Sequence, residues 1–326
     1  MVKEETSNLN IKPLVNISDI VKKTQNLYGK KEQGLATQIS TGVHMNKPVR
    51  DEDFVLWPKG DHWFQLTHLK GIPFGRIVQI SGKPDSGKSS HAMEFMVAAQ
   101  RAGTIVILFD SEQKFSPKRF NEHMGGRAED LLVVDTNNIL NGAKAVAHLV
   151  NMIKEQEPRQ KILIVWDSVG ASVNSSEDQE ENEDYSKQPG ITAKEVAFAI
   201  RKFNKLANKY FDRETGTQTI ATLVINQTYA NIGSVGQTEK GGSELTYLSS
   251  VIIQLSRKQD LNRIKKGEKY KYGIVSRAKV KKNHLFDGAE CISELDIVVS
   301  ADGIHLAKDV KGFDDIQGWE ESNSEE

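Results

Sequence analysis

The sequence predicts an α/β fold built on a doubly wound, mostly parallel β-sheet with helices on both faces. Two observations lead to this prediction. Short, β-branched apolar runs recur along the chain, and helix-length segments separate several of them. Within the runs consecutive residues are apolar, which is typical of strands covered on both faces. The runs are residues 77–80, 104–109, 131–134, 162–166, 219–225 and 251–255.

Helical patterns follow three of these runs and complete the predicted core, which extends from about residue 57 to residue 255. The helical segments are residues 89–102, 142–155 and 192–208. Two later runs, residues 272–280 and 294–299, predict further strands, antiparallel at one edge of the sheet.

The composition excludes several classes of protein. Cys291 is the only cysteine, so neither an intrachain disulfide nor a cysteine-rich metal site is expected. No signal peptide and no membrane-spanning apolar run is present, and we expect a soluble, cytoplasmic protein with no membrane contact. Lys and Arg total 43 against 44 Asp and Glu. The cations concentrate in residues 257–282, which we interpret as a duplex-DNA groove, a subunit interface or a solvated hairpin.

A phosphate-binding motif follows the first run. Residues 82–89 fit G-x-x-x-x-G-K-[ST] between a predicted strand and a predicted helix, a context that argues against a chance glycine-rich turn. Backbone N–H groups and the helix dipole would hold phosphates, Lys88 would neutralise the β- and γ-phosphates, and Ser89 would ligate Mg²⁺. The expected ligands are therefore ATP and Mg²⁺. Candidate nucleotide contacts are Gly82, Lys83, Pro84, Asp85, Ser86, Gly87, Lys88, Ser89 and Ser90.

Three further polar residues follow buried strands, and the ends of parallel strands meet in one crevice. Asp167 is a candidate second Mg²⁺ holder, although an acid at this place is also a common helix cap. Glu112 is a candidate for polarising the attacking water; the alternative is a solvated loop acid. Gln227 is a candidate γ-phosphate sensor, but an Asn-Gln pair by itself equally fits an ordinary turn.

In order, these pieces resemble the RecA-type recombinases of bacteria and phages. The lead-in to the phosphate loop resembles the G-G-[LI]-P-x-G-R-[IV]-x-E-I-x-G of that family, and later segments resemble its F-[IV]-D-A-E, D-S-V, I-N-Q, G-G-x-A-L-x-[FY] and R-x-K-[VI]-x-K-N motifs. The matching segments are residues 69–82, 109–112, 167–169, 225–227, 241–251 and 277–283.

The resemblance implies a RecA-like P-loop NTPase that binds ATP between adjacent protomers of a helical filament. Glu112 matches the catalytic glutamate of the family, and Lys282 matches a lysine that reaches the γ-phosphate of the neighbouring subunit. Where the family has a second such lysine, this sequence has His284. Where the family has an aromatic residue that stacks on adenine, this sequence has Arg119. An imidazole is largely neutral near pH 7, so His284 would neutralise less charge than a lysine.

The resemblance also implies binding of single-stranded and double-stranded DNA. Lys194 and Arg201 fall where the family has basic DNA contacts. The second DNA-binding loop corresponds to residues 228–242, and the first, residues 173–190, departs from the family because six acids would repel phosphates. Candidate contacts near the second loop are Lys240, Gly241, Gly242 and Ser243.

We therefore expect an N-terminal polymerisation arm (1–50), a RecA-like ATPase core (51–300) and a short segment with an acidic tail (301–326). The short chain favours a phage-encoded member in the host cytoplasm, with single-strand-binding or loader proteins as further partners. Two alternatives remain open at this point. One is a ring-forming DNA motor with the same fold, and the other is a regulator or accessory paralogue that does not exchange strands.

Overall fold

The computed structural model describes residues 50–58, 62–175, 190–211, 217–230, 237–239, 242–285 and 292–312. The chain divides into two compact units, Met1–Arg50 and Asp51–Glu326, and everything below concerns the second. Residues 1–49 of the predicted N-terminal arm, residues 176–189 of the acid-rich segment predicted as the first DNA-binding loop, and the tail after residue 312 lie outside the described residues.

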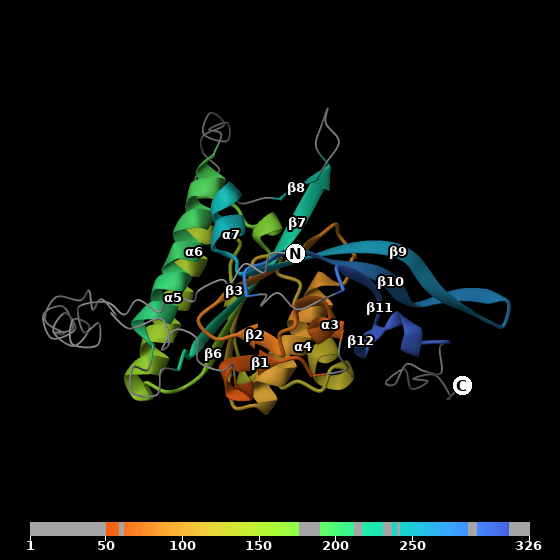
Figure 1. Cartoon of the computed structure of the whole chain (residues 1–326), viewed down its shortest axis with the longest axis horizontal. Helices are drawn as coiled ribbons and strands as arrows, with labels where there is room; N and C mark the ends of the chain where they lie inside the picture. Colours follow the sequence, from red (N-terminus) through yellow and green to blue (C-terminus); the bar gives the residue numbers. More distant parts are fainter. Residues whose placement is uncertain are drawn as a thin grey trace, which may run out of the picture. The chain divides into compact units, whose positions relative to one another are not determined.

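A parallel sheet occupies the centre of this unit (Figure 1). Its strands lie in the order β9-β3-β7-β6-β4-β5, and neighbouring strands in this path are parallel. Each predicted run forms one of these strands. The apolar residues of the runs are mostly covered on both faces, except in β5 at the edge, where Leu132 and Val133 are exposed. The strands are β3 (Ile77–Gly82), β4 (Ile105–Asp110), β5 (Leu131–Asp135), β6 (Ile162–Asp167), β7 (Ile220–Ala230) and β9 (Val251–Lys265).

Helices cover both faces of the sheet, so the predicted doubly wound fold is confirmed. Alternate residues of β4 show the two faces. Val106 and Leu108 pack in the cluster that contains α4, whereas Ile107 and Phe109 pack in the cluster that contains α5 and α6. The helices are α4 (Lys88–Arg101), α5 (Ile139–Gln156) and α6 (Ile191–Lys209).

Three antiparallel strands extend the sheet beyond β9, and the first two of them are those that the later runs predicted. They are β10 (Glu268–Asn283), β11 (Glu294–Ser300) and β12 (Gly303–Leu306). Because β12 pairs with β11, the sheet continues past residue 300, where the core was expected to end.

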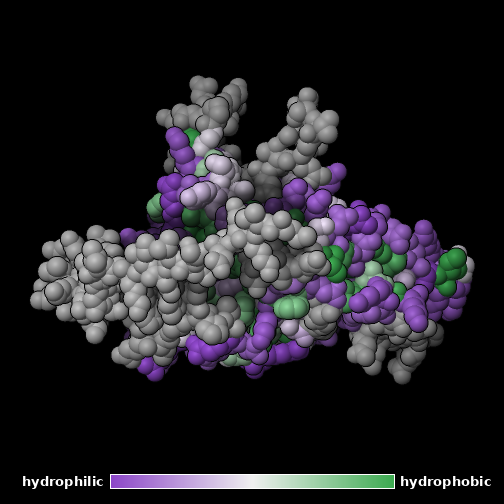
Figure 2. All heavy atoms as spheres, in the orientation of Figure 1, coloured by the Kyte–Doolittle hydropathy of each residue, from purple (hydrophilic) through white to green (hydrophobic). Residues whose placement is uncertain are grey.

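The cation-rich segment forms a long hairpin of β9 and β10 that projects beyond the rest of the sheet (Figure 1), with a largely hydrophilic surface (Figure 2). Acids of β11 offset part of its charge. Arg277 contacts Glu294 at 3.0 Å and Asp296 at 2.9 Å, and Lys258 contacts Asp296 at 2.8 Å. The cation excess seen in the sequence is therefore reduced where the hairpin meets β11.

Shorter elements complete the unit. The segment predicted as a DNA-binding loop at residues 228–242 is partly a ribbon, because β7 continues past Gln227 and its backbone pairs antiparallel with β8. Among the described residues, no helix has the length and apolarity needed to cross a membrane. The shorter elements are β1 (Phe54–Leu56), α3 (His62–Thr67), β2 (Gly71–Pro73), β8 (Gln237–Glu239) and α7 (Gly242–Leu248).

A buried histidine near the start of α4 predicts acid sensitivity of folding. His91 is 1% exposed, its Nδ1 lies 3.0 Å from the Gly87 carbonyl oxygen, and its ring lies 5.5 Å from that of Trp57. Burial lowers the pKa of His91 to about 4, although the hydrogen bond to Gly87 favours the charged form. Between pH 6.5 and about pH 4, His91 therefore binds a proton in the unfolded chain but not in the folded chain.

We expect the free energy of unfolding to fall as the pH drops through this window, by at most about 3 kcal/mol from this group. In His91→Asn, whose amide can keep the hydrogen bond to Gly87, the loss should be smaller. Urea denaturation of both proteins at pH 7 and pH 5 measures the difference. An equal loss in the two proteins would assign the acid sensitivity to other groups.

Candidate functional site

The predicted phosphate loop lies between β3 and α4 and borders a pocket of about 490 Å³. Gly87 precedes the first residue of α4 with φ 94°, in the left-handed region that glycine adopts without strain. A Cβ at Gly87 would also lie 2.7 Å from a methyl group of Val299. The backbone N–H groups of the first turn of α4, which have no intrahelical partners, are thereby placed at the pocket.

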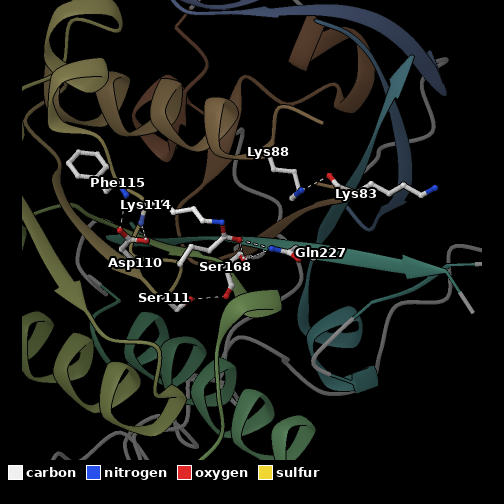
Figure 3. A network of polar contacts seen from close by, with 9 residues as sticks. Lys83, Lys88, Asp110, Ser111, Lys114, Phe115, Ser168 and Gln227 are labelled. Carbon is white, nitrogen blue, oxygen red and sulfur yellow. Dashed lines mark hydrogen bonds and ion pairs between the residues drawn. The ribbon is translucent and has the colours of Figure 1, made fainter. Parts of the chain in front are cut away.

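Lys88 is 7% exposed and lines this pocket. Its Nζ donates a hydrogen bond to the Lys83 carbonyl oxygen at 2.7 Å. Burial lowers the pKa of Lys88, while Asp167, Glu112 and Asp85 act in the opposite direction. The Lys83 side chain extends away from the Lys88 amine (Figure 3). Lys83, a predicted nucleotide contact, therefore holds the Lys88 amine through its carbonyl oxygen and not through its side chain.

Asp167 ends β6 at the pocket, as predicted, and fits a magnesium site. Its Oδ1 is buried and has no hydrogen-bond partner among the described residues. Burial raises the pKa of Asp167 to about 7, although a hydrogen bond from Ser89 lowers it. A buried carboxylate oxygen with open coordination, beside the hydroxyl of Ser89, matches the oxygen ligands that Mg²⁺ prefers. Ser89 and Asp167 would therefore hold the ion.

Glu112, Ser168 and Gln227 form a hydrogen-bonded triangle where β4 and β6 end beside β7. Figure 3 labels Ser168 and Gln227 in this network. Glu112 Oε1 accepts from Ser168 Oγ at 2.5 Å and from Gln227 Nε2 at 2.7 Å. Burial raises the pKa of Glu112, but hydrogen bonds from Ser168, Gln227 and Lys114 outweigh burial and the pKa is lowered. Glu112 is therefore an ionised carboxylate at neutral pH, and it lines the same pocket as Lys88.

Asp110 and Glu112 both line the pocket, and their hydrogen bonds show that the two acids have different tasks. Asp110 accepts hydrogen bonds from the backbone N–H groups of Phe115 (2.9 Å) and Lys114 (3.4 Å), and so holds the loop that carries Glu112. Ser111 Oγ donates to the Ser168 carbonyl oxygen at 2.7 Å and joins β4 to β6. The interpretation of Glu112 as a freely solvated loop acid is therefore wrong.

Sequence reasoning assigned no role to Ser168 or Gly170. A Cβ at Gly170 would lie 2.6 Å from the Gln227 side chain, so only glycine leaves room for this glutamine. The position of Ser168 directly after Asp167, at the end of the same strand, was the sequence signal that could have identified it. The contact of Gly170 with Gln227 had no local signal. The Asn-Gln pair is not a turn, because both residues lie within β7.

Arg119, the predicted adenine stacker, lines the wall of the pocket. Its Nη2 donates to Ser90 Oγ at 2.9 Å and to the Ser300 carbonyl oxygen at 3.4 Å. Burial lowers the pKa of its guanidinium, which Glu94 partly offsets. Arg119 also lines a second, adjoining pocket of about 380 Å³ beside β10 and β11. Its stacking on a base stays a prediction.

The predicted DNA contacts of α6 and α7 lie together. A Cβ at Gly242, the first residue of α7, would lie 3.0 Å from that of Ala193, the neighbour of Lys194. Arg201 Nε contacts Glu244 Oε1 at 2.8 Å, so this cation is paired with an acid of α7. Ser243 is exposed in the first turn of α7, and Lys240 and Gly241 lie outside the described residues.

Lys282, predicted to act on a neighbouring subunit, is not among the residues that line the pocket. Its Nζ donates to the carbonyl oxygens of Thr246 (2.7 Å) and Tyr247 (2.9 Å), at the C-terminal end of α7. A cation at a helix C-terminus is favourably placed. Lys282 and the predicted DNA contacts of Gly242 and Ser243 are thus at opposite ends of one short helix.

Comparisons with known proteins agree with this geometry. The model of the family described as the RecA N-terminal domain matches residues 63–305. "Protein RecA" of Picosynechococcus sp. is 31% identical over 231 residues, which are 70% of this chain and 60% of that protein. "Protein RecA" of Gloeothece citriformis is 29% identical over 74% of this chain and 63% of its own length. The chain thus spans less than two thirds of these two relatives.

Proposed function

Because this chain belongs to the RecA family, we propose that it is an ATP-dependent recombinase that polymerises on single-stranded DNA. It would catalyse homologous pairing and strand exchange with duplex DNA in recombination and repair. Its ATPase activity would depend on DNA, with ATP and Mg²⁺ as substrate and cofactor. The phage origin, the host-cytoplasm location and the loader or single-strand-binding partners stay predictions.

The 2.7 Å hydrogen bond between Gln227 and Glu112 is the observation that carries the proposal. Glu112 stands where a carboxylate can orient the water that attacks the γ-phosphate. Gln227 lies on β7, whose continuation pairs with β8 and leads to α7 and the predicted DNA contacts. A shift of β7 on DNA binding would change the hydrogen bonding of the carboxylate, which couples hydrolysis to DNA.

The remaining residues of the pocket have separate tasks in this proposal. The Lys88 amine would leave the Lys83 carbonyl and offset negative charge on the β- and γ-phosphates. Bound Mg²⁺ would supply further charge neutralisation at the phosphate oxygens, held by Ser89 and Asp167. Glu112, ionised because its pKa is lowered, would accept the proton of the attacking water.

A filament is proposed because the pocket lacks a cation that the family motif predicts in trans. Lys282 matches that motif and its Nζ lies at the end of α7, apart from the residues that line the pocket. A neighbouring protomer would bring its own Lys282 to the γ-phosphate and thereby complete the site. The arrangement would link each ATP to two protomers.

The proposal is tested by measuring ATP turnover and DNA binding of the full chain. We expect turnover to rise at least tenfold with single-stranded DNA, which corresponds to an activation free energy lower by about 1.4 kcal/mol. DNA affinity should be higher with a non-hydrolysable ATP analogue than without nucleotide. Transfer of a strand between matched circular and linear DNA distinguishes a recombinase from an accessory paralogue. Equal DNA binding with and without the analogue would contradict the proposal.

A further inference from the structure

The outward face of α6 carries an aromatic residue that the packing of the core does not explain. The Phe198 side chain is 43% exposed, whereas Phe203, on the opposite face of the helix, is fully buried. Phe198 lies four residues after Lys194 and three before Arg201, so the three residues share one face of the helix. The two flanking residues are the cations predicted to contact DNA.

The charge of this face is that of a surface for a polyanion. Lys194, Arg201 and Lys205 are exposed, and Lys202 Nζ lies 5.5 Å from the centre of the Phe198 ring. The one acid within α6 is Glu195, which is 8% exposed and accepts hydrogen bonds from the Ser175 backbone at 3.1 and 3.2 Å. Among the described residues of α6, the outward face thus carries only positive charge.

We propose that Phe198 stacks on a base of the bound single strand, between phosphates held by Lys194 and Arg201. This inference deepens the proposed DNA binding and rests on it. Surfaces for single strands combine cations that follow the backbone with aromatic side chains on which bases stack, and any base can stack because each has a π-face. The Phe198 side chain meets the second requirement where the flanking cations meet the first.

Arg201 and Lys202 have other partners in the absence of a strand. Arg201 is paired with Glu244 of α7 at 2.8 Å, and both side chains are partly exposed, so the pair is weak enough for a phosphate to replace it. Lys202 lies over the Phe198 ring and can turn to a phosphate when a base takes its place. Binding of a strand therefore frees the ring face that the stacking needs.

A second copy of the chain is the less favoured occupant of this face. Two like-charged helix faces repel each other, and a single exposed ring flanked by cations offers little apolar area for a protein interface. A single strand of DNA has negative charge that the cations of this face attract and flat bases that can stack on the exposed ring.

The experiment compares two oligonucleotides of equal length, one of thymidines and one of abasic sites, so that their phosphate charge is equal. Binding to the full chain is measured with a non-hydrolysable ATP analogue. For Phe198→Leu we expect affinity for the thymidine strand to fall about five- to 100-fold. Affinity for the abasic strand should change by less than about twofold, because only phosphate contacts remain.

Phe198→Trp and Phe64→Leu are the matched variants. Tryptophan keeps a stacking surface, so Phe198→Trp should retain affinity, and its added fluorescence should be quenched by the thymidine strand alone. Phe64 has a similar exposure, 47%, but lies on α3, where the same change should leave DNA affinity unaltered. The melting temperature of each variant controls for folding.

Two results would overturn the stacking role alone. One is unchanged affinity of Phe198→Leu for the thymidine strand, and the other is an equal loss on both strands, which would indicate a steric role. If the unsubstituted chain bound neither strand, the proposed function itself would fail and the stacking role with it.

Discussion

Lys88→Ala should lower ATP turnover by about 10²–10³-fold, the usual cost of removing one preorganised charge from a reacting centre. The Lys88 amine is buried, and its hydrogen bond to Lys83 holds it at the pocket. Nothing else among the described residues of the loop can replace its charge, because the Lys83 side chain is directed away (Figure 3). Turnover with saturating single-stranded DNA measures the effect, and turnover within tenfold of the unsubstituted chain would contradict it.

Mixing variants tests whether the site is shared between protomers. Lys282→Ala should also lose turnover, because its neighbour then lacks the cation supplied in trans. In a mixture of Lys88→Ala with Lys282→Ala, some interfaces combine an intact Lys88 with an intact Lys282 of the next protomer. Activity should therefore reappear on mixing. Two inactive proteins that stay inactive when mixed would indicate that Lys282 acts within its own chain or stabilises α7 alone.

Glu112→Gln should lower turnover by about 10²–10⁴-fold while ATP binding persists. The amide oxygen can still accept hydrogen bonds from Ser168 and Gln227, so the triangle keeps its shape. What is lost is the negative charge that orients water and accepts its proton. Because the pKa of Glu112 is lowered, the unsubstituted chain should keep this base ionised down to mildly acidic pH. Single-turnover hydrolysis and nucleotide binding are measured in parallel.

Asp135→Asn is the matched control for that experiment. Asp135 ends β5 in register with Asp110 of β4, but it accepts a hydrogen bond from Gln113 at 2.8 Å and is not among the residues that line the pocket. Its loss should change turnover by less than about twofold. Equal losses in Glu112→Gln and Asp135→Asn would show that any strand-end carboxylate matters, and the assignment of Glu112 would be wrong.

Much of the fold follows from local pattern. The runs at residues 77–80, 104–109 and 162–166 form inner strands because consecutive apolar residues need cover on both faces, which a sheet between two helical layers provides. The phosphate loop was also recognisable from a local pattern of residues. Its glycines, lysine and serine meet their partners within a few residues, so their spacing in the chain already describes the geometry.

Contacts between distant residues could not be predicted in the same way. Gln227 is 115 positions from Glu112. Lys282 of β10, whose amine binds the C-terminal end of α7, is 36 positions from Thr246. The pairing of Arg201 with Glu244, and of the hairpin cations with Glu294 and Asp296, likewise joins separate elements. Each depends on which strands become neighbours and in what register.

By itself, then, the sequence determined the layered α/β architecture, the phosphate loop and the presence of acids at strand ends, because all three depend on neighbours in the chain. Only the tertiary structure decided that Glu112 rather than Asp110 faces Gln227, and that acids on β11 offset cations of the hairpin. Those outcomes depend on strand order and register, which bring together side chains that no spacing in the sequence relates.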